Sequence, residues 1–164
     1  MKKYELTNQF ITVNSVTLYR IKALRNFGNV KAGDIGGYIE KEENLSHSGN
    51  CWVYHNAKVC DNATVYDDAS IMSDAVVFDN AKVYCNSKVH GDAVIYGNAK
   101  VHGDAIISDN VSVYDEAEIF GKAVIFGSAT ICDNAIVCDS ARVFGKSKID
   151  KDTLVSGRTC VFDM

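Results

Sequence analysis

The stretch "GDAVIYGNAKVHGDAIIS" (residues 91–108) holds three copies of one six-residue pattern, and this pattern decides the fold. Each copy contains a small residue, one variable residue and then Val or Ile. The aliphatic position recurs at every sixth residue from Val53 to Val161, nineteen times without an insertion or deletion. A helix would need a period near 3.6 residues, and a meander of hairpins would need longer strands and variable loops. Self-similarity at a fixed short period instead indicates a solenoid.

The order of residue types within each hexad specifies a short strand followed by a corner. The small residue, usually Ala, and the Val or Ile share one side of the strand, because alternate side chains face opposite sides. Gly or Asp and then Asn or Asp precede the small residue in most copies, and these types tolerate positive φ or bond their own backbone. Proline, which cannot donate to a strand ladder, is absent from the chain. The sequence therefore predicts an all-β parallel β-solenoid with a core column of Val and Ile.

The order of Val or Ile, three residues, a small residue and one more residue resembles the hexapeptide repeat of left-handed β-helix proteins. The resemblance covers residues 50–164 and implies a triangular coil of three hexads, hence about six coils of about eighteen residues. Proteins of that kind usually place a small or acidic residue directly after the aliphatic one, whereas this chain often places an aromatic residue there. An aromatic residue in this position affects the geometry of the corner, so a flatter coil of two hexads stays an open alternative.

Residues 1–48 depart from the hexad and are predicted to form an N-terminal cap, with the solenoid over residues 49–164. A solenoid leaves bare strands and a bare core at its ends, so a capping segment is expected. The segment "VTLYRIKALRNF" (16–27) alternates well enough for one or two strands, with a turn at Asn26–Gly28. Residues 1–49 carry seven Lys or Arg against five Asp or Glu, and residues 50–164 carry ten against sixteen. The acidic solenoid does not favour direct contact with nucleic acid.

The N-terminus "MKKYELTNQF" lacks the apolar region of a signal peptide, and no stretch approaches eighteen apolar residues, so no membrane association is expected. The six cysteines form no CxxC pair, which favours reduced thiols in a cytoplasmic protein. We predict no metal site and no cofactor.

His90 and His102 are the candidate catalytic residues, because both occupy the slot after Val and lie twelve residues apart. A coil of three hexads would place them on different faces, whereas a coil of two hexads would stack them. No third ligand or base accompanies them at a convincing spacing. A solenoid without insertions also predicts a convex rod that lacks a concave pocket. The expectation is therefore a protein that is not an enzyme and has no catalytic residue.

Carboxylates recur in the two corner slots of the solenoid, and we call the following set the acidic ridge. Stacked corners would array these groups at a spacing comparable to that of DNA phosphates, which predicts a surface that mimics DNA. Asp and Asn are also simply favourable corner residues, and this alternative stays open. The acidic ridge comprises Asp61, Asp67, Asp68, Asp79, Asp109, Asp115, Glu116, Asp133 and Asp139.

Aromatic residues recur in the outward slot after the aliphatic residue, and we call them the aromatic column. The rings either stack on one another between coils, which would stabilise the solenoid alone, or form a surface for a protein partner. The residues predicted to bind a partner are Tyr66, Tyr84, Tyr96, Tyr114 and Phe120.

The segments "LYRIKALRNF" (18–27), "GDIGGYIEKEENLS" (33–46) and "GNCWVY" (49–54), followed by hexads such as "NAKVYC" (80–85), resemble a family of phage and prophage proteins. Some β-helical phage proteins of this kind are similar to anti-CRISPR proteins that inhibit Cas9. The resemblance implies that the acidic ridge would face the basic cleft where Cas9 reads duplex DNA.

The expected function is thus a non-enzymatic, phage-encoded inhibitor that binds a host protein, Cas9 or another DNA-binding nuclease, as a DNA mimic. One alternative is a structural or assembly module that self-associates as a homodimer through its last coil, around Val161 and Phe162. A second alternative is an enzyme similar to hexapeptide acyltransferases, which would require His90 or His102 to be essential.

Overall fold

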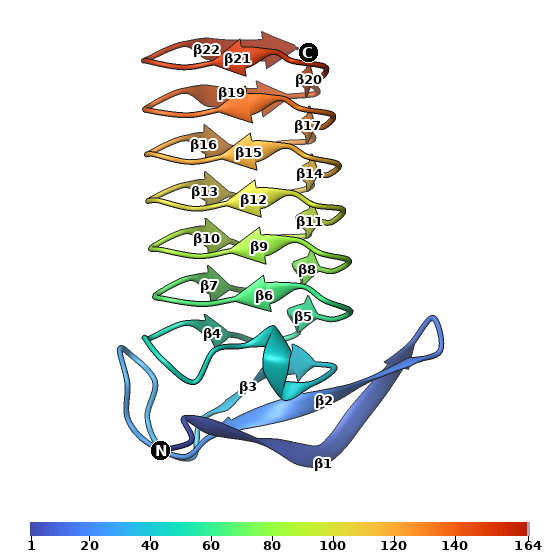
Figure 1. Ribbon diagram of the computed structural model, residues 1–164, viewed down its shortest axis with the longest axis vertical. Helices are drawn as coiled ribbons and strands as arrows, with labels where there is room; N and C mark the ends of the chain where they lie inside the picture. The colour runs from blue at the N-terminus through green and yellow to red at the C-terminus, as the bar shows by residue number, and fades with distance from the viewer. Residues whose placement is uncertain (164) are drawn as a thin grey trace.

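The computed structural model describes residues 1–163 and shows a triangular rod of stacked coils with a hairpin across its base (Figure 1). The base consists of strands β1 (Tyr4–Val13), β2 (Val16–Ala23) and β3 (Ile35–Ile39) and the short 3₁₀ helix η1 (Glu42–Asn44). Strand β2 pairs antiparallel with β1 and β3, and β3 then pairs in parallel with the solenoid strand β5 (Lys58–Val59). Within residues 1–163 no helix is long and apolar enough to cross a membrane.

The solenoid strands form three parallel sheets, in each of which neighbouring strands are eighteen residues apart in sequence. Sheet 1 continues from β3 with β5 (Lys58–Val59), β8 (Val76–Val77), β11 (Val94–Ile95), β14 (Ser112–Val113), β17 (Thr130–Ile131) and β20 (Lys148–Ile149). Sheet 2 contains β4 (Trp52–Val53), β7 (Ser70–Ile71), β10 (Lys88–Val89), β13 (Ile106–Ile107), β16 (Val124–Ile125), β19 (Arg142–Gly145) and β22 (Cys160–Asp163). Sheet 3 contains β6 (Thr64–Val65), β9 (Lys82–Val83), β12 (Lys100–Val101), β15 (Glu118–Ile119), β18 (Ile136–Val137) and β21 (Leu154–Val155).

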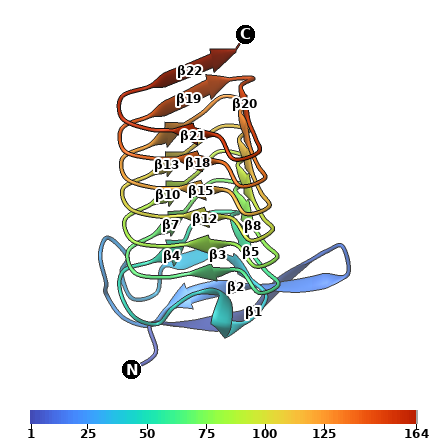
Figure 2. The ribbon, with the colours of Figure 1, turned by 45° about the horizontal axis from the view of Figure 1, so that its top comes forward.

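The coil length confirms the predicted solenoid of three hexads per turn and excludes the flatter coil of two. Strands β4 to β21 make six complete coils of three strands, and β22 begins the next. In Figure 1 the chain rises from β4 to β22, and the strands of sheet 3, which lie nearest the viewer, run to the left. The coils are therefore left-handed (Figures 1 and 2).

The predicted inward column is the core of the rod. Ile95, Val101 and Ile107 from three successive strands are all fully buried, and so are the Ala residues that precede them by two positions, such as Ala105. Ala suits these positions because the triangle narrows toward its corners, where a larger side chain would meet the neighbouring sheet. The aliphatic position is therefore buried from Val53 to Val155, while Val161 at the upper end of the rod is only half-buried.

The corners have the positive φ angles that the Gly and Asp residues predict. Asp61 has φ 55° and Asp79 has φ 57°, while Gly103 at the equivalent position has φ 68°. The corner backbone also continues the ladder between coils, since Asn98 N donates to Asp115 O at 2.7 Å. Each corner therefore turns the chain without interrupting its stacking on the next coil.

The cap closes the lower end of the core. Tyr4 and Ile21 are fully buried, and Trp52 of β4 packs edge-on against Phe27 and Tyr4 with ring centroids 5.3 and 6.1 Å apart. The sequence correctly predicted a strand within residues 16–27, but strand β1 was missed. The boundary between the cap and the solenoid at residue 48 stays a prediction, because β3 of the cap belongs to the same sheet as the solenoid strands.

Ile107→Ala is expected to lower the free energy of unfolding by about 2–5 kcal/mol, because it removes a fully buried side chain and leaves a cavity. Ile106→Ala in the same strand is the matched control, since Ile106 points outward and is only half-buried. Urea denaturation of both variants checks this. Equal losses would contradict the inward assignment of Ile107.

Candidate functional site

The structure divides the acidic ridge among the three corners of the triangle. Five residues follow the strands of sheet 1, namely Asp61, Asp79, Asp115, Glu116 and Asp133. Asp109 follows sheet 2, and Asp67, Asp68 and Asp139 follow sheet 3. The nine carboxylates thus form three separate sets and not one continuous line.

Seven of these carboxylates have a structural role inside the solenoid. Each accepts a hydrogen bond from the backbone N–H eighteen residues further along the chain, where the next coil turns the same corner. The donors and acceptors are Asp79 N to Asp61, Cys85 N to Asp67, Gly97 N to Asp79, Gly127 N to Asp109, Asp133 N to Asp115, Lys151 N to Asp133 and Gly157 N to Asp139, at 2.9–3.3 Å. The remaining two accept from asparagine side chains, Asp68 from Asn50 and Glu116 from Asn98. These bonds explain why Asp occurs at the corners. Binding of a partner protein by the acidic ridge stays a prediction.

Asp79→Ala is expected to destabilise the fold by about 1 kcal/mol, because the Gly97 N–H loses its acceptor. Asp79→Asn keeps an acceptor oxygen and should cost less. Asp92→Ala is the control, since exposed Asp92 makes no side-chain hydrogen bond within residues 1–163. Thermal denaturation of the three variants measures the difference, and an Asp92→Ala loss as large as that of Asp79→Ala would refute the corner role.

The aromatic column forms stacks that run parallel to the rod. On one corner Tyr66, Tyr84, His102 and Phe120 stack in order, with centroids 4.6–5.1 Å apart and planes within 9°. A second stack contains Phe78, Tyr96 and Tyr114, and a third contains Phe126, Phe144 and Phe162. The stacking alternative is therefore confirmed as a structural feature, while binding of a partner by these rings stays a prediction.

His102 differs from the other members of its stack because it also contacts a carboxylate. Its Nε2 atom lies 2.9 Å from Oε1 of Glu118, which extends from β15 on the next coil. Tyr84 and Phe120 cover the two faces of the imidazole ring, and the His102 side chain is 21% exposed. The carboxylate and the two rings therefore hold the imidazole in one orientation while an edge remains open to solvent.

His90 lies on a different corner from His102, as the three-hexad coil predicts. It follows β10 of sheet 2, whereas His102 follows β12 of sheet 3. Within residues 1–163 the His90 side chain has no carboxylate within salt-bridge distance. Of these two histidines, His102 therefore has the carboxylate partner that orients a catalytic histidine.

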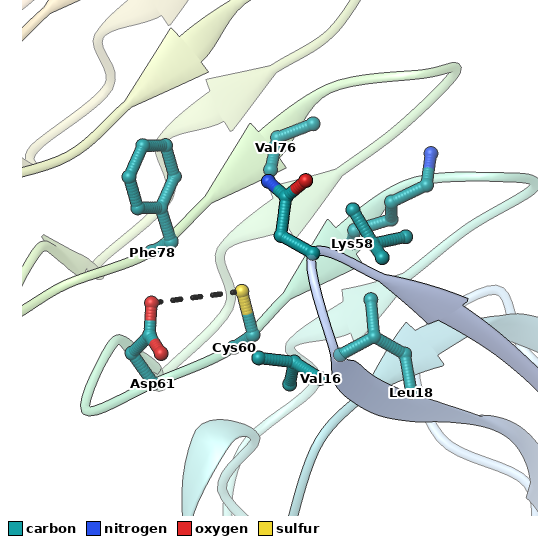
Figure 3. Close-up of a pocket in the computed structure, with 9 residues that line it drawn as sticks. Val16, Leu18, Lys58, Cys60, Asp61, Val76 and Phe78 are labelled. Atoms are coloured by element: carbon teal, nitrogen blue, oxygen red, sulfur yellow. Dashed lines mark hydrogen bonds between the residues drawn. The ribbon is translucent and has the colours of Figure 1, made fainter.

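The expectation of a rod without a concave pocket is wrong, because the β1–β2 hairpin folds back against sheet 1 (Figure 3). An apolar pocket with a volume of about 160 Å³ lies between them. Its walls are Val13, Asn14, Val16 and Leu18 of the hairpin and Lys58, Cys60, Asp61, Val76 and Phe78 of the solenoid. The sequence reasoning looked for insertions within the coils and missed the hairpin that precedes them.

Cys60 in this pocket is a poor nucleophile. Burial, together with the neighbouring carboxylates of Asp61 and Glu40, raises the pKa of its thiol to about 12. The thiol therefore keeps its proton near neutral pH, where a reactive cysteine would need to be a thiolate.

Iodoacetamide at about pH 8 is expected to alkylate exposed Cys160 and to leave Cys60 unmodified, because only the thiolate reacts. Peptide mass spectrometry after a timed reaction measures both sites. In denaturant the two cysteines should react alike. Equal rates in the folded protein would contradict the raised pKa of Cys60.

One group of potential metal ligands occurs on the sheet 1 corner. Asp115, Cys132 and Asp133 bring their ligand atoms within 4.8 Å of one another. One Asp115 oxygen already accepts the Asp133 N–H at 3.3 Å. The group is thus part of the corner ladder described above.

Comparison with known proteins gives one informative match. No family model matches the chain. The chain is 34% identical over 67 residues to a protein of Escherichia coli strain K12 described as "uncharacterized acetyltransferase YdcK", with 36% of this chain and 21% of that protein covered. The chain thus spans about a fifth of that relative's length.

This match overturns the function expected from the sequence. A relative described as an acetyltransferase contradicts a non-enzymatic, DNA-mimicking inhibitor of Cas9. The part of the resemblance that holds is the hexapeptide-repeat β-helix, whereas its link to phage and anti-CRISPR proteins receives no support. The expectation of a protein that is not an enzyme had rested in part on the absence of a concave pocket, and the cap supplies such a pocket.

Proposed function

We propose that this chain is an acyltransferase-like enzyme of the hexapeptide-repeat type, which transfers an acetyl group from a thioester to an amine or hydroxyl acceptor. The observation that carries the proposal is the match to a protein described as an acetyltransferase, made by a chain whose solenoid has three hexads per coil. The geometry of His102 supports it.

The transfer needs a base that removes a proton from the acceptor. As the acceptor nitrogen or oxygen attacks the thioester carbonyl, its proton moves to the base, the C–S bond breaks and the thiol leaves with a proton. Histidine suits this role because its pKa lies near neutral pH. The chemistry therefore requires an imidazole in which one nitrogen is free to accept the proton and the other is fixed by a hydrogen bond.

His102 meets this requirement. The Glu118 carboxylate bonds to Nε2 at 2.9 Å, which leaves Nδ1 to accept the proton, and it stabilises the imidazolium that then forms. Tyr84 and Phe120 flank the ring at 4.6 and 5.1 Å and restrict its rotation. We assign His102 as the general base and Glu118 as the residue that positions it.

The apolar pocket is not assigned to the same step. It lies against sheet 1, whereas His102 lies at the corner that follows sheet 3. His102 and Glu118 are therefore the residues that support the proposal, without the pocket.

His102→Phe is expected to lower the rate of thiol release from acetyl-CoA by about 10²–10⁴-fold, because the general base is lost. Phe preserves the ring stack, since Phe120 occupies the next position of the same column. Glu118→Gln should lower the rate less, because it keeps the size of the side chain but removes the charge. A colorimetric thiol assay with a panel of amines and alcohols measures these rates.

His90→Phe is the matched control and should keep the full rate, because this histidine shares the slot of His102 but lacks its carboxylate. Circular dichroism confirms that the variants remain folded. A calorimetric titration with acetyl-CoA that shows no heat, together with no thiol release, would disprove the proposed function. Equal losses in the His90 and His102 variants would disprove the assignment of the base.

A further inference from the structure

Lys3 and Cys51 form a buried pair at the junction of the cap and the first coil. Both residues have no exposed surface. Lys3 Nζ donates to the carbonyl oxygen of Cys51 at 2.8 Å and lies 3.2 Å from its Sγ atom. Cys51 occupies the first small-residue slot of the solenoid, where most other coils have Ala, such as Ala57. The amine and the thiol are therefore in direct contact inside the protein.

The surroundings of this pair contain no acidic partner for the lysine. Within residues 1–163 no carboxylate lies within salt-bridge distance of Lys3, and its Nζ instead lies 5.0 Å from the centre of the Phe27 ring. Burial lowers the pKa of the Lys3 amine and raises that of the Cys51 thiol. Both shifts favour a neutral amine beside a neutral thiol, in which the nitrogen lone pair is available to react.

The sulfur atom is also enclosed. Its other polar neighbours are the backbone oxygens of Ser46, Val65 and Ser48, at 3.5, 3.6 and 3.8 Å. These oxygens cannot condense with an oxidised sulfur, whereas the Lys3 amine can. An oxidised Cys51 sulfur would therefore meet the Lys3 nitrogen before a second thiol. Simple condensation with loss of water would give an N–S bond, whereas the bridge proposed here keeps one oxygen atom between nitrogen and sulfur.

We propose that Lys3 and Cys51 are a covalent modification site, at which one oxygen atom is inserted between nitrogen and sulfur to form an N–O–S bridge. The oxidant is dioxygen or a peroxide. With dioxygen, R–NH₂ and R′–SH and O₂ yield R–NH–O–S–R′ and H₂O, so one N–H bond and one S–H bond are lost. One oxygen atom enters the bridge and the other leaves as water. A thiol reductant reverses the reaction.

The bridge would join two segments that are 48 residues apart in sequence. Lys3 immediately precedes β1, and Cys51 immediately precedes β4. A cross-link between distant residues constrains the unfolded chain, as a disulfide does, so the bridged protein should resist unfolding more strongly. Oxidation would thus lock the cap onto the first coil.

The test uses the Cys160→Ser variant, which lacks the exposed thiol and keeps Lys3 and Cys51, before and after exposure to hydrogen peroxide. Intact mass should rise by one oxygen less two hydrogens, about 14 Da, and dithiothreitol should restore the original mass. Digestion should yield one peptide pair that joins residues 3 and 51. The melting temperature should rise by several degrees and return after reduction.

Lys3→Arg and Cys51→Ala should each abolish the mass gain of about 14 Da and the joined peptide. Lys2→Arg is the matched control, because Lys2 is exposed and pairs with Glu42, and it should leave both signals unchanged. Ala is the residue of most equivalent slots, so Cys51→Ala should fold. Gains of only about 16 or 32 Da at Cys51, a loss of about 2 Da from a direct N–S bond, or an unmodified Cys51 would overturn the proposal.

Discussion

The hydrogen-bond ladder between successive coils is the interaction on which the rest of this structure depends. Most solenoid strands contain only two residues, and a strand of that length has no stability alone. Each coil holds its shape because its N–H groups pair with carbonyls seventeen residues further on, as Lys100 N does with Ala117 O. The same register buries Val101 on Val83 and Ile119. Backbone pairing and core packing therefore enforce one another, and an insertion in a coil would disrupt both.

This constraint also determines what the outward positions can do. Since every position of a coil lies over its equivalent in the next, chemically similar side chains become continuous rows. Rings become stacks and corner carboxylates become acceptors for the N–H groups of the next coil, as at Asp79 and Gly97. A departure from such a row is thus informative. His102 is such a departure, because it belongs to a ring stack and also bonds to Glu118.

The cap supplies the features that a regular rod lacks. Its hairpin covers part of sheet 1 and encloses the apolar pocket, and its first residues bring a buried amine to the thiol of Cys51. Both features lie where an irregular segment meets the first coils. The proposed catalytic pair lies elsewhere, within the regular part, and depends on the side chains of two adjacent coils.

The sequence by itself determined a solenoid, its core column and the positive φ of its corners, because a strict period of six places every Val and Ile on the inner side of a short strand. The structure decided that each coil contains three hexads and not two. The sequence also predicted that His90 and His102 would separate in a coil of three hexads. It could not show that the carboxylate of Glu118, sixteen residues away, would reach His102, or that Lys3 would lie beside Cys51. The first contact depends on how side chains of adjacent coils extend toward each other, and the second depends on how the cap folds back onto the first coil. The hexad period contains no information about side-chain conformation or about the path of residues outside the repeat. Only the tertiary structure decided these two contacts.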